Sequence, residues 1–318
     1  MGVGQYGKAV RSIDNGTSWD NETCQILTDL YGVTSGNNTF VAVGESGKIL
    51  RSTDNGSSWN NSTSPITTNL KGVTFGNNTF VTVSSYRKTV RSTNDGSTWS
   101  YTNTPSPYRA FYGVTFGNNT FVGVGQYGKA IRSIDNGGSW DNETCQILTD
   151  LNGVTSGNNT FVAVGESGKI VRSTDNGSSF STVSPYYVGN SYGVTFGNNT
   201  FVGVSYAGRT GRSTDNGTSF SLVNPPTAYT LNGVTFGNNT FVAVGTSGKI
   251  VRSTDNGTSW DNSTSPITEN LYGATFGNNN FVAVGSGGKI VRSTDNGTNW
   301  DNATSPITTN LKGVTFSE

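Results

Sequence analysis

The stretch RSTDNGTSWDN, Arg252–Asn262, recurs along the whole chain and decides its fold. Close copies begin at eight arginines: Arg11, Arg51, Arg91, Arg132, Arg172, Arg212, Arg252 and Arg292. A second marker, GVT or a variant of it, begins at eight glycines: Gly32, Gly72, Gly113, Gly153, Gly193, Gly233, Gly273 and Gly313. The spacing of this marker is 40 residues, with one step of 41. Such a period is typical of architectures built from stacked supersecondary units.

Each repeat is expected to form four short strands. In the seventh repeat, NGVTFGN, TFVAVG, GKIVRST and TSWDN are separated by turn signals such as Gly-Asn-Asn and Asp-Asn-Gly. Both alternating faces of TFVAVG are apolar, as expected for a strand that is covered on both sides. Four strands for every 40 residues indicate the blades of a β-propeller.

The two ends of the chain suggest how the ring closes. The chain begins within the second strand of a repeat, from Val3 onward, and ends with a lone first strand, GVTF, Gly313–Phe316. We expect this last strand to complete the N-terminal blade, so that no sheet edge stays open. The sequence thus predicts an all-β, eight-bladed β-propeller of four-stranded antiparallel blades, as a single domain over residues 1–318.

The opening motif suits a hairpin between the third and fourth strands. Asp255 can accept hydrogen bonds from turn amides, Gly257 can take a positive φ, and Trp260 can fold back to bury apolar area. Arg252 and Asp261 are expected to pair across the hairpin, for at most about 1 kcal/mol. Eight equivalent copies favour a structural role over a catalytic one, because enzymes build a site from unlike residues. The motif lacks the later ligands of a calcium loop, and we predict no metal site.

The pattern Ser253-x-Asp255-x-Gly257-x-x-Trp260 resembles the Asp-box, or BNR repeat, of sialidase-type propellers. The whole chain is also similar to the 40-residue blades of photosystem II stability/assembly factor-like proteins. In the Asp-box family these motifs lie away from the active site. The structural residues that the resemblance implies are Asp14, Asp54, Asp135, Asp175, Asp215, Asp255, Asp295, Trp19, Trp59, Trp99, Trp140, Trp260 and Trp300. Phe180 and Phe220 replace the tryptophan in two copies, and Asn94-Asp95 inverts the Asp-Asn order in one.

Composition argues against several function classes. The chain has no histidine, which removes the usual general base and the commonest zinc ligand. Lys+Arg and Asp+Glu balance at 20 each, and sixteen of the basic residues stand at two fixed repeat positions. No basic stripe is left for nucleic acid or an anionic membrane. We therefore predict no cofactor, no nucleic-acid partner and no membrane partner, and we expect a monomer.

Other features bear on localisation, which the sequence leaves open. No apolar run approaches the roughly 20 residues of a transmembrane helix, and MGVGQYGKAV does not have the pattern of a signal peptide. Cys24 and Cys145 occupy the same position in two repeats and are expected to be free thiols. Glycosylation sequons, for instance at Asn37 and Asn77, occur in almost every repeat and favour a microbial origin.

The repeats differ most in the turns between strands two and three and in the loops between blades. These segments are expected on one face, opposite the nearly invariant Gly-Asn-Asn and Asp-Asn-Gly turns. They hold the candidate ligand-binding residues Tyr86, Arg87, Tyr108, Arg109, Tyr186, Tyr187, Tyr206 and Arg209, together with Tyr101, Phe111 and Tyr229. Aromatic, proline-bearing loops suit a sugar or peptide surface, although neutral drift with local packing explains them equally.

One further set of candidates stands just before each GVT marker. It comprises Tyr31, Lys71, Tyr112, Asn152, Tyr192, Asn232, Tyr272 and Lys312. Because this position precedes the innermost strand, we expect the eight side chains to ring the mouth of the central channel. Such a ring can bind a polar or anionic ligand, or simply line a water-filled channel.

The sequence is consistent with three functions. The best supported is a non-enzymatic binding propeller that recognises a glycan or a protein through its variable face. The second is a purely structural product of repeat amplification, suggested by the near-identity of Gly4–Lys48 and Gly125–Lys169. The least supported is a sialidase-like glycoside hydrolase, which requires an arginine cluster and a Tyr/Glu nucleophile pair. We therefore predict that the protein has no catalytic residues.

Overall fold

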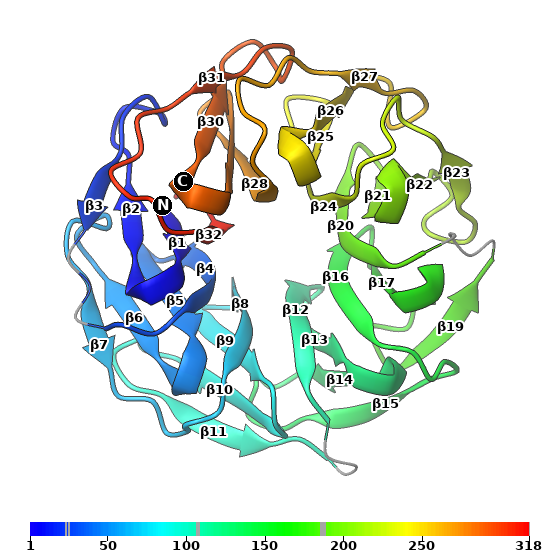
Figure 1. The fold of residues 1–318 in the computed structure, drawn as a ribbon. Coiled ribbons are helices and arrows are strands. Elements are labelled where there is room, and N and C mark those ends of the chain that lie inside the picture. Colours follow the sequence, from blue (N-terminus) through cyan, green and yellow to red (C-terminus); the bar gives the residue numbers. More distant parts are fainter. Residues whose placement is uncertain (23, 25, 106–108, 185–188, 318) are drawn as a thin grey trace.

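Eight four-stranded antiparallel blades form a closed ring, which confirms the predicted eight-bladed β-propeller (Figure 1). The structure is a computed structural model and describes residues 1–22, 24, 26–105, 109–184 and 189–317. Among the described residues, none lies in a helix long and apolar enough to cross a membrane.

Within each blade the four strands lie side by side, in order from the centre of the ring to its rim. The innermost strands are β32 (Leu311–Val314), β4 (Leu30–Gly36), β8 (Leu70–Gly76), β12 (Phe111–Gly117), β16 (Leu151–Gly157), β20 (Ser191–Gly197), β24 (Leu231–Gly237) and β28 (Leu271–Gly277). The second strands are β1 (Gly2–Gly4), β5 (Thr39–Gly44), β9 (Thr79–Ser84), β13 (Thr120–Gly125), β17 (Thr160–Gly165), β21 (Thr200–Ser205), β25 (Thr240–Gly245) and β29 (Asn280–Gly285).

The third strands are β2 (Ala9–Arg11), β6 (Ile49–Ser52), β10 (Lys88–Ser92), β14 (Ala130–Ser133), β18 (Ile170–Ser173), β22 (Thr210–Ser213), β26 (Ile250–Ser253) and β30 (Ile290–Ser293). The outer strands are β3 (Asp20–Glu22), β7 (Asn60–Ser62), β11 (Ser100–Asn103), β15 (Asp141–Cys145), β19 (Ser179–Val183), β23 (Ser221–Val223), β27 (Asp261–Asn262) and β31 (Asp301–Asn302). Single 3-10 turns join strands two and three: η1 (Gln5–Gly7), η2 (Glu45–Gly47), η3 (Gln126–Gly128), η4 (Glu166–Gly168), η5 (Tyr206–Gly208), η6 (Thr246–Gly248) and η7 (Ser286–Gly288).

The ring closes inside the first blade. β32 pairs antiparallel with β1, so that the blade has the order β3-β2-β1-β32 and the N and C labels lie close together in Figure 1. Two backbone hydrogen bonds extend the pairing, from the Met1 amine to the Thr315 carbonyl at 2.8 Å and from Thr315 N–H to the Met1 carbonyl at 2.9 Å. The expected completion of the first blade by the last strand is therefore confirmed.

The hydrophobic core lies between the blades. One cluster joins Val41, Val43 and Ile49 of the second blade to Phe80 and Val90 of the third, and similar clusters repeat around the ring. Every residue of each full-length second strand is buried, as the double-sided apolar pattern predicted. Each blade therefore depends on its two neighbours for burial of its strands.

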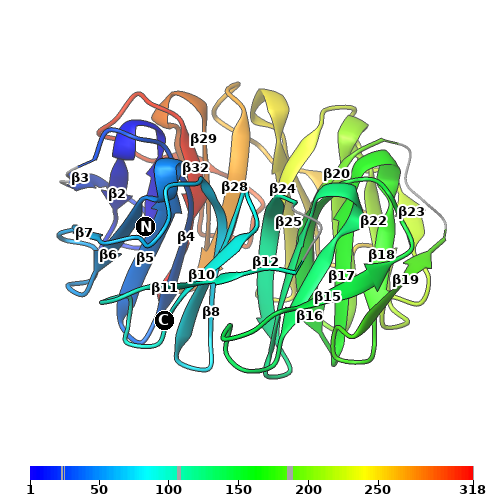
Figure 2. The same ribbon diagram turned by 90° about the horizontal axis from the view of Figure 1, so that it is seen from below.

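The two ends of the ring differ in their connections (Figure 2). The turn face carries the Asn-Asn turns between strands one and two and the Asp-Asn-Gly turns between strands three and four. These turns contact one another, as when the Asn37 side chain donates to the Asp95 carboxylate of the next blade at 3.0 Å. The loop face carries the seven 3-10 turns, the turn at residues 84–88 and the loops between blades. There Tyr6 N–H donates to the Asp29 carboxylate, and Gln5 N–H donates to the Asn310 carbonyl.

Candidate functional site

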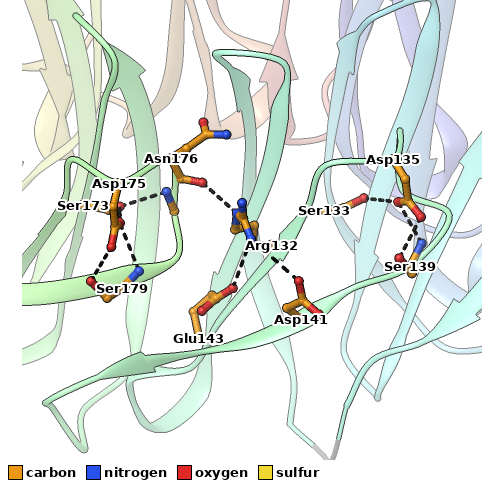
Figure 3. A network of polar contacts seen from close by, with 11 residues as sticks. Arg132, Ser133, Asp135, Ser139, Asp141, Glu143, Ser173, Asp175, Asn176 and Ser179 are labelled. Carbon is orange, nitrogen blue, oxygen red and sulfur yellow. Dashed lines mark hydrogen bonds and ion pairs between the residues drawn. The ribbon is translucent and has the colours of Figure 1, made fainter.

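The repeated motif forms one hydrogen-bonded turn in blade after blade, and Figure 3 shows two neighbouring copies. The Asp135 carboxylate accepts hydrogen bonds from the Ser133 hydroxyl, the Ser139 N–H and the Ser139 hydroxyl at 2.7–2.9 Å. The Ser133 hydroxyl oxygen also accepts from Gly137 N–H at 2.8 Å. Asn136 and Gly137 both have positive φ, of 57° and 74°. The carboxylate thus orders a turn, as predicted.

The arginine that opens the motif connects neighbouring blades in six copies, whereas Arg252 Nε and Arg292 Nε have no hydrogen-bond partner in the described part of the chain. Arg132 Nε donates to the Asn176 carbonyl of the next blade at 2.8 Å (Figure 3). Arg172 Nε donates in the same way to the Asn216 carbonyl. Arg132 also lies 3.7 Å from Asp141 and 3.9 Å from Glu143. Arg252 and Asp261 stand opposite each other in the strand register, but they form no ion pair among the described residues. The predicted pairing across the hairpin is therefore not general, and a bond to the next blade is the more regular feature.

The motif tryptophans are buried between blades. Trp140 is 5% exposed and packs with Val81 and Val83 of the preceding blade and Phe121 of its own. Phe180 and Phe220 are buried in the same position of their blades, and Trp99 is only partly buried. The aromatic side chain therefore packs between two neighbouring blades and does not cover the outer edge of a single blade.

The loop face presents exposed tyrosines. Tyr86 and Tyr206 are 55% and 57% exposed, and both lie on turns between strands two and three. Tyr6 and Tyr127, at 59% and 53%, occupy the same kind of turn but were not among the predicted residues. The signal was present in the sequence, because GQYGK replaces the GESGK or GTSGK of other repeats.

The other loop candidates have separate environments. The Arg109 guanidinium lies 4.7 Å from the centre of the Tyr127 ring, and the Arg109 carbonyl accepts from Arg87 N–H. Arg209 occupies the position that is lysine in other repeats and directly follows η5. Phe111 is buried in the core and belongs to no surface, which corrects its place among the loop candidates. Tyr108, Tyr186 and Tyr187 lie outside the described residues.

Two further tyrosines lie under lysines. Tyr101 belongs to the outer strand β11, with the Lys88 ammonium 4.3 Å from its ring centre. Tyr229 precedes β24, with the Lys249 ammonium at 5.4 Å. Each pair is a cation–π contact, whose strength at an exposed site is about 0.5–1 kcal/mol.

The eight residues before the GVT markers lie within the innermost strands rather than ahead of them. Tyr31, for example, is the second residue of β4 and stands at a β-bulge, where the register shifts between Leu30 and Gly32. A bulge redirects a side chain out of the regular alternation. Inner strands of neighbouring blades approach closely beside it, since a Cβ on Gly72 would lie 3.1 Å from the Tyr112 carbonyl oxygen.

Most of these ring residues contact a neighbouring element. The side chains of Asn152 and Asn232 donate to backbone carbonyls of the next blade at 2.8 and 2.7 Å. Tyr112 O–H donates to the Asp150 carboxylate at 3.3 Å, and Tyr272 shares a 2.7 Å hydrogen bond with Ser286. Tyr192 is 38% exposed. Much of the ring therefore stabilises contacts between blades.

Lys312, Tyr31 and Lys71 form a different arrangement across the first three blades. The two ammonium groups lie 4.7 and 4.2 Å from the centre of the Tyr31 ring. Lys312 also pairs with Asp29 at 2.8 Å, whereas Lys71 has no ion pair among the described residues. Burial, followed by the charge of Lys312, lowers the pKa of Lys71. This row of residues is the part of the ring that can attract an anionic group.

The two cysteines and the acidic residues form no reactive or metal-binding site in the described part of the chain. Cys24 and Cys145 are free thiols, as predicted, and burial raises the pKa of each to about 12. Such thiols are poor nucleophiles near neutral pH. Within the described part of the chain, no three His, Cys, Asp or Glu residues gather closely enough to hold a metal ion.

Three cavities lie on the turn face, where the sequence predicted no site. One of about 170 Å³ lies beside Met1 and Trp19. Another, of about 990 Å³, adjoins Ser35, and a third, of about 180 Å³, adjoins Ser156. Six other blades have phenylalanine where Ser35 and Ser156 stand. The second and third cavities therefore occur where serine interrupts the aromatic pattern of the repeat.

These observations define an eight-bladed β-propeller built from repeated hydrogen-bonded hairpins. No protein-family model matches the sequence, and no curated protein matches it. Among solved structures, the computationally designed Ika8 protein is similar over 91% of this chain and 91% of its own, at TM-score 0.75 and 12% identity.

Two structures of YCF48 share the fold as well. YCF48 bound to D1 peptide is similar over 92% of this chain and 97% of its own, at TM-score 0.66 and 14% identity. YCF48 from Cyanidioschyzon merolae is similar over 90% and 98%, at TM-score 0.65 and 15% identity. At these identities the likeness concerns the fold alone.

Proposed function

We propose that the protein is a non-enzymatic binding propeller that holds a protein partner on its loop face. The observation that carries this proposal is the set of exposed tyrosines on that face, among them Tyr86, Tyr127 and Tyr206. Tyrosine is enriched at protein interfaces because its ring buries apolar area while its hydroxyl still forms hydrogen bonds. A propeller of the same fold, YCF48, has a structure with bound D1 peptide.

The lysine row supplies an electrostatic part of the proposed surface. Lys71 and Lys312 stand on either side of Tyr31 at the inner edge of the loop face. Asp29 neutralises Lys312, which leaves Lys71 to meet an acidic side chain of the partner. Binding through this row weakens as salt is added, because ions screen the attraction.

The repeated motif is proposed to belong to the Asp-box repeats that it resembles. Its turn geometry, with a carboxylate bonded to a serine hydroxyl and turn amides, supports that proposal. A sialidase-like hydrolase is not favoured, because the motif arginines bond to the next blade instead of converging on one point.

The test uses peptide and glycan arrays probed with the intact protein and two double variants. Tyr127→Ser/Tyr206→Ser removes exposed rings from the loop face. Ile13→Ser/Ile134→Ser removes matched exposed apolar side chains, 69% and 60% exposed, from the turn face. We expect wild type to bind a subset of peptides, the tyrosine variant to lose at least about tenfold in affinity, and the isoleucine variant to bind as wild type.

Three outcomes would contradict the proposal in different ways. Selective binding to glycans, lost in the tyrosine variant, would identify the loop face as a carbohydrate surface. No binding to either array by the folded ring would instead support a structural product of repeat amplification. Equal loss in both variants would place the binding surface elsewhere.

A further inference from the structure

The third strand of each blade carries opposite charges at its two ends. A basic residue stands at its loop-face end and the motif aspartate at its turn-face end, as Lys8 and Asp14 do on either side of β2. The basic residue is Arg209 in the sixth blade, and the aspartate is Asp95, one position later, in the third. The ring therefore presents eight cations on its loop face and eight carboxylates on its turn face.

The carboxylates are the accessible charges of the turn face. The motif aspartates are exposed in seven of the eight blades. Hydrogen bonds from Ser18 lower the pKa of Asp14 to about 2, so this carboxylate is ionised at neutral pH. The arginines of the motif lie deeper, since the side chains of Arg11 and Arg132 are 19% and 16% exposed and bond to the next blade.

The two faces have opposite charge balances although the net charge of the chain is zero. Four aspartates follow the motif aromatic residue and join the eight motif aspartates, which gives twelve carboxylates against the eight motif arginines. The other twelve basic residues stand with seven acidic ones, counted without Glu318, which lies outside the described residues. The turn face is therefore acidic and the loop face basic.

Several cations of the loop face are available to a partner. Lys8, Lys48 and Lys129 form no ion pair among the described residues, unlike Lys289 and Lys312. Each of the three side chains is half-buried. A lysine in this situation lays its stem along the protein and keeps its ammonium group in water.

The two sets of charges match in radius and in spacing. Both stand at the ends of the same third strands, so they lie at similar distances from the ring axis, and successive members of each set are one blade apart. A rotation that places one aspartate of a ring over one lysine of a second ring therefore aligns all eight pairs. Two loop faces, or two turn faces, would instead bring like charges together.

Exposed apolar side chains accompany these charges in the first and fourth blades. Ile13 and Ile134, 69% and 60% exposed, directly precede a motif aspartate. Tyr6 and Tyr127, 59% and 53% exposed, lie at the other ends of the same two strands, two residues before the lysine. Because these blades are three positions apart, only one of the eight rotations brings both isoleucines against both tyrosines.

We propose that the turn face of one molecule docks on the loop face of a second copy, so that rings stack along a common axis. This contact joins two different surfaces and does not close, and it therefore generates an open stack rather than a dimer. The proposal goes beyond the monomer expected from the sequence. A protein partner on the loop face and a second ring exclude each other, because both use that face.

Sedimentation velocity at increasing protein concentration measures the stacking. At low salt we expect a dissociation constant on the order of 100 μM for each contact, because exposed ion pairs are individually weak. The average mass should keep rising with concentration. Raising the salt from about 20 to about 300 mM should weaken the contact at least about tenfold. A mass that stays monomeric to about 1 mM at low salt, or stops at a dimer, would overturn the proposal.

The decisive test uses one variant for each face. Asp14→Asn/Asp54→Asn/Asp135→Asn neutralises part of the turn face, and Asn94 shows that an amide holds the same turn. We expect this variant alone to lose at least about tenfold in affinity for itself, with the circular dichroism of wild type. Its loop face stays intact and remains able to receive another ring.

The loop-face variant is Lys8→Gln/Lys48→Gln/Lys129→Gln, and it should show the same loss when studied alone. An equimolar mixture of the two variants retains one intact loop face and one intact turn face. The mixture should form a one-to-one dimer with the affinity of wild type and should grow no further. Absence of this dimer would contradict head-to-tail stacking.

A protein that combines all six substitutions is the control for net charge, since its net charge is zero like that of wild type. It should remain monomeric under the conditions in which wild type stacks. Stacking of this control as strong as that of wild type would show that zero net charge alone causes the association. In that case the two charged faces would not be a docking surface.

Discussion

The turn face and the loop face are built by the same repeats but under different constraints. On the turn face, Asp54 and its equivalents order a turn, and Arg132 and five of its equivalents bond that turn to the next blade. On the loop face, the 3-10 turns keep one backbone geometry while their side chains differ, as Tyr127 and Ser167 show. Side chains are restricted where they themselves join the blades, and they differ where the turn is joined to the next blade through its backbone N–H, as at Tyr127 and Ser167.

The largest effect is expected from a substitution that disrupts the packing between two blades. Trp140→Ala removes a side chain that is 5% exposed and should lower the free energy of unfolding by about 3–5 kcal/mol. Urea unfolding followed by circular dichroism measures the change. Tyr127→Ala removes an aromatic ring from the loop face, with its cation–π contact to Arg109, and should stay within about 1 kcal/mol of wild type. Similar losses in both variants would refute the contrast between the faces.

A second expected effect concerns the buried amine of Met1. Its pKa falls from 8.0 in the unfolded chain to about 5 in the folded protein, so the unfolded state binds the extra proton between these values. Stability should therefore be complete above pH 8.0 and should fall toward pH 5, by up to about 1.4 kcal/mol per pH unit. The chain has no histidine to mask this dependence.

The control for this effect is protein whose amine is acetylated, compared with the free form by urea unfolding at several pH values. Both forms share every carboxylate, including Glu22 and Glu143, whose pKa values are raised first of all by burial. The difference between the two curves thus isolates the amine. Parallel curves from pH 8.0 to 5 would show that the amine is not buried in solution.

The smallest expected effect concerns the turn carboxylates. Asp54→Asn should cost less than about 1 kcal/mol at pH 7, because Asn94 already holds the equivalent turn through Ser92 and Thr98. The Ser58 hydroxyl, and then the Ser58 N–H, lower the pKa of Asp54 from 3.8 to about 2. The carboxylate's contribution is present above pH 3.8 and is lost as the pH falls to about 2.

Acid unfolding measures this contribution. The difference in stability between wild type and Asp54→Asn should shrink between pH 5 and pH 2. A difference that stays constant across this range would mean that the ionised Asp54 carboxylate is no better stabilised in the folded protein than in the unfolded chain.

The sequence was sufficient to predict the fold because local and long-range signals agree in each repeat. The GVT marker, the apolar TFVAVG strand and the Asp-Asn-Gly turn each indicate the same blade, and the lone GVTF indicated closure. The bond from Arg132 to the Asn176 carbonyl was not predicted, because it joins residues 44 positions apart through a backbone atom. No side-chain pattern encodes such an acceptor.

The candidate sites were harder to predict. The position of Tyr31 was expected at the mouth of the channel, but its bulge and its contacts with two lysines depend on the packing of three blades. Tyr6 and Tyr127 were overlooked because they belong to the duplicated segment and appeared to be part of the regular repeat. Two turn-face cavities adjoin Ser35 and Ser156, which stand where other repeats have phenylalanine, and only the ring as a whole shows which surfaces these spaces adjoin.

The closure within the first blade also makes the ring mechanically uneven. Seven blades link their first and second strands through a covalent Asn-Asn turn, whereas β32 and β1 are linked by hydrogen bonds. These two strands can separate without any covalent strain, while every other pair is tethered. Fraying of the ring therefore starts where β32 pairs with β1. A circular permutation that moved this non-covalent strand pair to another blade would move the point of opening with it.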